Sequence, residues 1–247
     1  MADILKFPHE RAVIDALADY LVADIRRVLG RQDRYRWALA GGSTPECLYR
    51  RLARPDVVGL LDWSRIHMFW SDERCVAADD IQSNYRMARE SLLDHVPIPA
   101  GNIFPIDGTL DPERSAMAYA AILDGEPLDL ILLGMGDDGH TASLFLTTPH
   151  LREESRLVIA TRSLLPPVHR ISLSLRTINA ARRVVFLVIG EHKADRLAQV
   201  MDQHGRQDAT LPAAMVNPES GDLHWFLDHA AAARLKTPLP GEAQKQN

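Results

Sequence analysis

The feature that most constrains this chain is a repeated unit, in which a short apolar run ends at glycines or charged residues and a helical pattern follows. The first such run, residues 37–40, stops at a double glycine, and apolar residues then recur at helical spacing. Further apolar runs lie at residues 66–70, 128–133 and 184–189. Strands that alternate with helices are typical of a parallel sheet covered on both faces. We therefore expect an α/β fold with a mostly parallel sheet.

The remaining segments continue this pattern. We expect helices over residues 10–29, 84–96, 111–123, 191–202 and 228–235, strands over 157–161, 171–175 and 223–227, and a short apolar run at 102–106. We interpret residues 1–235 as a single domain, with a small antiparallel extension formed by residues 150–180. Residues 236–247 are predicted to form a polar tail.

Charge and cysteine content narrow the possible partners. The chain has 247 residues and a formal net charge of -5, which argues against a nucleic-acid surface but leaves room for a small anionic ligand held by a few arginines. Cys47 and Cys75 are not in a CxxC pair and are interpreted as reduced thiols. Because no apolar run has the roughly 20 residues of a membrane span, and the N-terminus does not have the apolar core of a signal peptide, we expect a cytoplasmic protein without membrane or nucleic-acid partners.

The first motif is a glycine-rich turn at the end of the first apolar run. Gly41 and Gly42 let the backbone turn and approach a ligand closely, and Pro45 suits the first turn of a helix. The amides of such a helix start favour an anion, and Ser43 or Thr44 can add a hydroxyl. The alternative is a plain tight turn with a capping serine or threonine.

Two further motifs follow apolar runs at what should be the same sheet edge. Asp72 and Arg74 come just after residues 66–70, where open parallel sheets bind ligands, although this motif taken alone is explained more simply by a surface ion pair. Asp138 and His140 follow residues 128–133 and lie among glycines, which is hard to explain by packing. Histidine is the natural general acid or base near neutral pH. The nearby aspartate is expected to orient the histidine or to cap the next helix, and one histidine with nearby aspartates is too small a ligand set for a metal.

Two more cations lie near strand ends. Arg170 begins one predicted strand, and Lys193 follows another. Taken alone, each is interpreted as a solvated surface charge. They become candidate phosphate ligands only because the other motifs already call for an anionic partner.

In combination these motifs resemble the bacterial 6-phosphogluconolactonases, a family grouped with the glucosamine-6-phosphate deaminases. The matching segments are 41–45, 71–74, 134–145, 170–174, 179–182 and 190–193, and their order and spacing agree with the family from residue 10 to residue 235. The resemblance implies a doubly wound, Rossmann-like sheet and an enzyme that hydrolyses a phosphorylated sugar lactone without metal or cofactor. It implies a small-molecule partner; we expect a monomer or a weak homodimer.

Two positions favour the lactonase branch over the deaminase branch. The deaminases have a catalytic glutamate at the position of Phe145, and a tyrosine at the position of Arg74. The chain also departs from many lactonases at Asp137, where those proteins often have proline. A third alternative is a non-catalytic sugar-phosphate-binding module; retention of both Asp138 and His140 favours catalysis, and the early first helix leaves no room for the DNA-binding segment of such regulators.

The resemblance also implies roles for the candidate residues. His140 is expected to act as the general base, Asp138 to orient it, and Asp72 to bind sugar hydroxyls or position water. The residues expected to bind phosphate and sugar acid are Gly41, Gly42, Ser43, Thr44, Arg74, Arg170 and Lys193.

Overall fold

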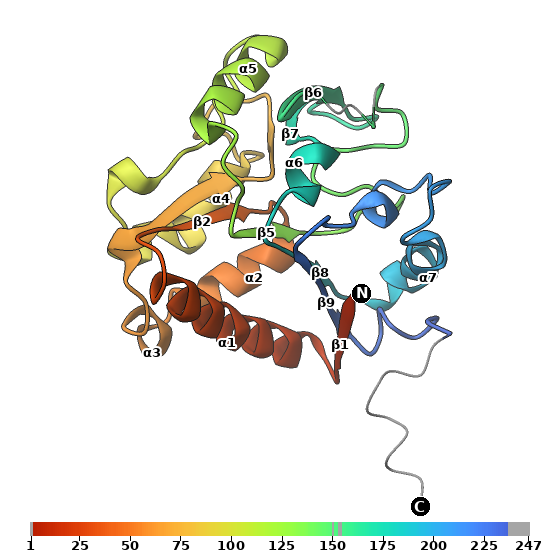
Figure 1. Ribbon diagram of the computed structural model, residues 1–247, viewed down its shortest axis with the longest axis horizontal. Coiled ribbons are helices and arrows are strands. Elements are labelled where there is room, and N and C mark those ends of the chain that lie inside the picture. The colour runs from red at the N-terminus through yellow and green to blue at the C-terminus, as the bar shows by residue number, and fades with distance from the viewer. Residues whose placement is uncertain (1, 150, 153–154, 237–247) are drawn as a thin grey trace, which may run out of the picture.

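The computed structural model describes residues 2–149, 151–152 and 155–236 of the chain (Figure 1). The predicted polar tail lies, except for Lys236, outside these residues. The strands are β1 Asp3–Phe7, β2 Tyr35–Leu39, β3 Ile66–Trp70, β4 Asp72–Arg74, β5 Leu130–Leu133, β6 Val158–Arg162, β7 His169–Leu173, β8 Arg183–Val188 and β9 Asp222–Asp228. The α-helices are α1 Glu10–Leu29, α2 Ser43–Leu52, α3 Pro55–Val58, α4 Asn84–Ser91, α5 Pro112–Leu123, α6 Leu175–Asn179 and α7 Ala194–Gln203. Short 3-10 turns are η1 Trp63–Arg65, η2 Leu93–His95, η3 Ala100–Asn102, η4 Glu191–Lys193 and η5 Pro212–Met215.

Six strands form the main sheet in the order β1-β9-β8-β5-β2-β3, and every neighbouring pair is parallel. The expected mostly parallel, doubly wound α/β fold is therefore confirmed. From β2 the chain first adds β3 on one side, and later adds β5, β8 and β9 on the other side. The strand order thus reverses between β2 and β5, and such a reversal opens a crevice at the carboxyl ends of the strands.

The centre of this sheet is buried on both faces. Every residue of β2 and β5 is buried, and because side chains alternate across a strand, both faces must be covered. Helix α1 buries Val13, Leu17, Leu21 and Ile25, which recur at intervals of four residues and form one face. Figure 1 shows α1 and α2 side by side along the sheet, where α1 contacts β1, β2 and β9.

A smaller antiparallel sheet has the order β4-β7-β6, which confirms the expected extension. Its strand β4 comes from outside the predicted range 150–180, because the chain passes from β3 through Ser71 into β4. Residues 150 and 153–154 of the predicted range lie outside the described residues. The small sheet packs against α5 (Figure 1) and carries two of the candidate arginines.

Some expected boundaries were wrong. The helix expected at 228–235 is absent: Asp228 pairs with Phe7 as the last residue of β9, and residues 229–234 form turns whose backbone hydrogen bonds are mostly of the three-residue kind. The strand expected at 171–175 ends at Leu173, since Ser174 caps α6 by accepting from the amide of Thr177 at 3.2 Å. The run 102–106 makes a single bridge, Met68 to Ile103, and Pro105 lacks the N–H needed to extend it.

The sequence analysis did not predict strand β1 or the 3-10 turns η4 and η2. Strand β1 was not expected, and it pairs with β9 at the far end of the chain. The segment 191–202 begins as the 3-10 turn η4 before α7, and the helix expected over 84–96 ends at Ser91 and continues as η2. Among the described residues, none of the helices combines the length and the apolar character that crossing a membrane requires.

Candidate active site

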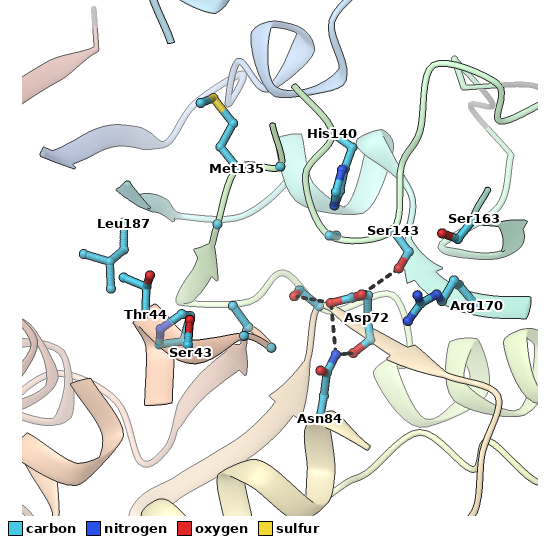
Figure 2. Close-up of a pocket in the computed structure, with 18 of the residues that line it drawn as sticks. Ser43, Thr44, Asp72, Asn84, Met135, His140, Ser143, Ser163, Arg170 and Leu187 are labelled. Carbon is cyan, nitrogen blue, oxygen red and sulfur yellow. Dashed lines mark hydrogen bonds between the residues drawn. The ribbon is translucent and has the colours of Figure 1, made fainter. Parts of the chain in front are cut away.

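A cavity of about 510 Å³ lies at the carboxyl edge of the main sheet, where the strand order reverses between β2 and β5. The segments that follow β2, β3, β5 and β8 line it, and the small antiparallel sheet closes one side (Figure 2). Because these four strands are neighbours in the sheet, segments far apart in sequence meet at one place. This is the crevice that the reversal of strand order creates.

The wall that follows β2 is the double-glycine turn. Gly42 has φ of 105°, a conformation that favours glycine, and it precedes the first residue of α2, Ser43. A Cβ on Gly41 would lie 1.9 Å from Oδ1 of Asn84, so the position has no space for a side chain. No side chain among the described residues caps α2, and the turn lines the cavity. Its amides can therefore take an anionic group.

The wall that follows β5 carries the candidate base. Nδ1 of His140 lies 2.5 Å from Oδ1 of Asp138, and the same carboxylate oxygen accepts from the backbone amide of His140 at 3.1 Å. The imidazole is 32% exposed and lies over Gly136, where an added Cβ would come within 2.1 Å of Nδ1. The ring of Phe145 packs beside it, with centroids 4.7 Å apart. Figure 2 shows His140 projecting into the cavity rather than into packed interior.

The electrostatics of Asp138 suit an orienting role. Partial burial opposes its charged form, but the backbone amide and the imidazole of His140 outweigh burial and lower the pKa of the carboxyl. Asp138 therefore stays ionised at neutral pH and accepts the Nδ1 proton of His140. This leaves Nε2 as the nitrogen that can accept a proton from a ligand or water.

Asp72 lies on the floor of the cavity. It is 8% exposed, and its Oδ2 accepts from the hydroxyl of Ser143 at 2.6 Å. Asn84 donates to the backbone carbonyl of Asp72 at 2.9 Å, while its own Oδ1 is buried without a partner among the described residues. The carboxylate is thus held by groups that leave it facing the cavity, where it can accept hydrogen bonds from hydroxyls (Figure 2).

The neighbouring carboxylate, Glu73, has a different surrounding. It does not line the cavity but accepts from the backbone amides of Asn84 and Tyr85, each at 2.8 Å, and from the hydroxyl of Ser83 at 3.0 Å. Burial raises the pKa of Glu73 although these amides oppose the rise. Glu73 therefore anchors the start of α4 and, through it, Asn84.

Two arginines face each other on the small sheet. Arg74 on β4 and Arg170 on β7 are register partners in the antiparallel ladder, so like charges sit directly opposite. Arg170 is only 8% exposed, and its buried Nε has no hydrogen-bond partner among the described residues. Burial and the charge of Arg74 lower the pKa of this guanidinium. An anion between the two arginines would relieve both costs.

The wall that follows β8 carries Lys193, at the end of η4. Its Nζ lies 2.6 Å from Oδ1 of Asp137, the residue before Asp138. Nε2 of His192 lies 4.0 Å from the same oxygen. This hydrogen bond from Lys193 lowers the pKa of Asp137. Both Lys193 and His192 line the cavity.

The structure brings most of the sequence-predicted residues together. Nine line the cavity: Gly41, Gly42, Ser43, Thr44, Asp72, Arg74, His140, Arg170 and Lys193. Asp138 lies behind His140 and does not line it. Sequence reasoning missed Asn84, Ser143, Ser163 and His192, which line it too. Ser143 and His192 lie inside motifs already singled out, whereas Asn84 had no signal beyond its place at a helix start. The described residues contain no cluster of three or more histidine, cysteine or carboxylate side chains that could hold a metal.

Comparisons with known proteins agree with this geometry. A family model described as glucosamine-6-phosphate isomerases/6-phosphogluconolactonase matches residues 8–225. A 6-phosphogluconolactonase of Nostoc sp. is 41% identical over 239 residues, which cover 92% of this chain and 96% of the relative.

Solved structures show the same likeness. The crystal structure of 6-phosphogluconolactonase from Thermotoga maritima is 32% identical with a TM-score of 0.80, and the match covers 92% of this chain and 100% of that one. A monomeric glucosamine-6-phosphate deaminase also has a TM-score of 0.80, over 94% of this chain and 99% of its own, but at 21% identity. The likeness to the deaminase therefore concerns the fold alone.

Proposed function

We propose that this chain, which belongs to the family of glucosamine-6-phosphate isomerases and 6-phosphogluconolactonases, hydrolyses 6-phospho-D-glucono-1,5-lactone to 6-phospho-D-gluconate. One arrangement carries the proposal: an imidazole hydrogen-bonded to a carboxylate, in a cavity that is also lined by two arginines and a lysine. The substrate has the matching chemistry, with an ester carbonyl at one end and a phosphate at the other. The identity to named lactonases over most of the chain supports the same reaction.

The proposed mechanism begins with water at the lactone carbonyl. Nε2 of His140 takes a proton from this water as its oxygen attacks C1, and Asp138 stabilises the resulting imidazolium. The tetrahedral intermediate then collapses, the bond from C1 to the ring oxygen breaks, and His140 returns the proton to that oxygen. The proton that His140 takes from water is thus the one that it gives to the ring oxygen, so no second acid or base is needed. A ring ester is already activated, so one positioned base together with fixed substrate suffices for a modest acceleration.

The cations are proposed to hold the substrate rather than to react. Arg74 and Arg170 offer an anion two guanidinium groups, while Lys193 and the amides at the start of α2 offer a point charge and a helix end. Asp72, fixed by Ser143, is proposed to accept from sugar hydroxyls or to position the water.

The deaminase alternative lacks a proton carrier. In that branch a glutamate takes part in acid–base chemistry at the position of Phe145, and here the aromatic ring packs beside His140 instead. A hydrocarbon ring cannot exchange a proton. An assay for ammonia release from glucosamine 6-phosphate should therefore give no signal above background.

The direct test is a coupled assay with freshly generated 6-phosphogluconolactone, in which the production of 6-phosphogluconate is compared with spontaneous decay. We expect a rate proportional to enzyme concentration. A rate equal to the spontaneous decay at all enzyme concentrations would overturn the proposal. A protein that binds sugar phosphate in calorimetry but does not turn over would be a sensor.

The setting of the reaction is part of the same proposal. We propose that the chain acts in the cytoplasm, in the oxidative pentose phosphate pathway, as a monomer or weak homodimer with a small phosphorylated lactone as partner. The two unpaired cysteines, Cys47 and Cys75, support a reducing compartment.

A further inference from the structure

The ammonium of Lys193 already has an anionic partner, the carboxylate of Asp137 at 2.6 Å. The two side chains differ sharply in exposure. Lys193 is 18% exposed and lines the cavity, whereas Asp137 is 76% exposed and does not line it. The carboxylate therefore contacts the lysine from the solvent side of the cavity wall. It binds the ammonium group that an anionic ligand in the cavity would also need to bind.

The main chain at Asp137 is held independently of this ion pair. Nε of Arg196 donates to the backbone carbonyl of Asp137 at 3.0 Å. The methylene carbons of the same arginine lie over Gly139, where an added Cβ would be 3.2 Å from Cδ. The carboxylate can consequently leave Lys193 by side-chain rotation, without moving the loop that carries His140.

Asp137 and Asp138 thus have separate partners although they are adjacent. Asp138 holds His140, and Asp137 holds Lys193, with His192 4.0 Å away on the same oxygen. The carboxylate of this pair is largely exposed to solvent, and ion pairs that water reaches contribute little and exchange readily. A phosphate carries nearly two negative charges at neutral pH and several acceptor oxygens, so it can displace a single carboxylate.

We propose that Asp137 competes with the substrate's phosphate for Lys193 and so sets the KM of the reaction without affecting kcat. The inference rests on the proposed function, which makes Lys193 a phosphate ligand. The carboxylate must be displaced each time substrate binds. A lactone without phosphate cannot displace it, so Asp137 affects only phosphorylated substrates.

The test is Asp137→Asn, which keeps the shape of the side chain and removes its charge. We expect about a two- to fivefold lower KM for the phosphorylated lactone with unchanged kcat, the range that one exposed ion pair supports. The KM for unphosphorylated gluconolactone should not change. The difference in KM should narrow as salt is raised, because added ions screen the pair.

Matched variants separate this effect from a general change of charge. Asp137→Glu retains the carboxylate and should keep KM close to that of the original chain. Asp208→Asn also removes one exposed, ion-paired carboxylate, 71% exposed and 2.8 Å from Arg206, but outside the cavity lining, and should leave KM unchanged. In a Lys193→Gln background, Asp137→Asn should have no further effect on KM.

The direction in which KM changes in Asp137→Asn decides whether the inference holds. If Asp137→Asn raises KM, the carboxylate positions Lys193 for substrate and the inference is wrong; an unchanged KM also overturns it. Calorimetry with inorganic phosphate tests the same point without turnover. If none of the variants hydrolyses the lactone, the proposed function fails, while tighter phosphate binding by Asp137→Asn would still support the inference, and equal or weaker binding would overturn it.

Discussion

The cavity has two cationic regions that are built in opposite ways. On the small antiparallel sheet, Arg74 and Arg170 face each other in register, and the buried Nε of Arg170 has no partner among the described residues. In the segment that follows β8, Lys193 at the end of η4 has a charge partner 2.6 Å away in Asp137. In the first region a buried guanidinium nitrogen has no partner within the described part of the chain, and in the second the ammonium is satisfied by a carboxylate that can rotate away.

This difference between the arginine and lysine regions predicts which of them contributes more to the affinity for a phosphorylated ligand. A buried guanidinium without a full set of partners already carries the cost of desolvation, so a ligand gains the whole of each new hydrogen bond. A paired lysine must first lose its carboxylate, so the ligand gains only the difference. We therefore expect the arginine region to contribute more affinity than the lysine region, and neither region to contribute to the chemical step.

The largest expected effect tests that last point. His140→Ala should lower kcat by about 10²-fold or more with a smaller change in KM, because it removes the general base but neither cationic region. Steady-state kinetics on the phosphorylated lactone measure this, and calorimetry with inorganic phosphate should give unaltered binding. A kcat close to that of the original chain would remove His140 from the mechanism.

The next largest effects are on KM, and they compare the arginine region with the lysine region directly. Arg170→Ala should raise KM for the phosphorylated lactone by about tenfold or more, since it removes charge-assisted hydrogen bonds, and Lys193→Ala should raise it by a smaller factor. The preference over unphosphorylated gluconolactone should fall in both variants.

Arg170→Lys serves as the control for this comparison, because it retains the charge but loses the bidentate geometry, and should lie between Ala and the original residue. Thermal unfolding of each variant checks that the small sheet is intact. A larger effect of Lys193→Ala than of Arg170→Ala would reverse the comparison.

The smallest effect concerns pH and the Asp137 ion pair. Because the hydrogen bond from Lys193 lowers the pKa of Asp137, the folded state holds this proton less tightly than the unfolded chain does. The pair therefore stabilises the fold above the ordinary aspartate value of about 3.9, and this stability is lost as pH falls through the lowered pKa. Urea unfolding midpoints of the original chain and of Asp137→Asn should differ slightly at pH 7 and converge as the pH falls below the ordinary aspartate value. Midpoints that stay equally far apart throughout this range would contradict the pairing.

Much of the site was predictable because its signals are local. Gly41, Gly42 and His140 follow apolar strands of the main sheet, and parallel strands bring their carboxyl ends to one edge whatever the details of packing. Arg74 and Arg170 instead reach the cavity from the small antiparallel sheet, and they were expected there only from the family resemblance. The same reasoning predicted the parallel sheet, since buried central strands such as β5 read as unbroken apolar runs.

The rest depends on contacts that no short window of sequence contains. Asn84 reads as an ordinary helix start, and its place in the cavity follows from Glu73, which anchors that start across a loop. Strand β1 is short and carries charged residues, and only its pairing with β9 makes it a strand. Residues 228–235 have helical composition, but Asp228 pairs with Phe7 as the last residue of β9 and the residues after it form turns.

The contact between Gly41 and Asn84 couples the residues that these two positions of the cavity wall can hold. The amide oxygen of Asn84 fills the volume that a methyl group on residue 41 would need. Alanine at position 41 alone should therefore meet a clash, while the same alanine in an Asn84→Gly background gains room. Which residues are tolerated at position 41 therefore depends on the residue at position 84. A mutant library should vary the two positions together, because varying them one at a time cannot produce the compatible pairs.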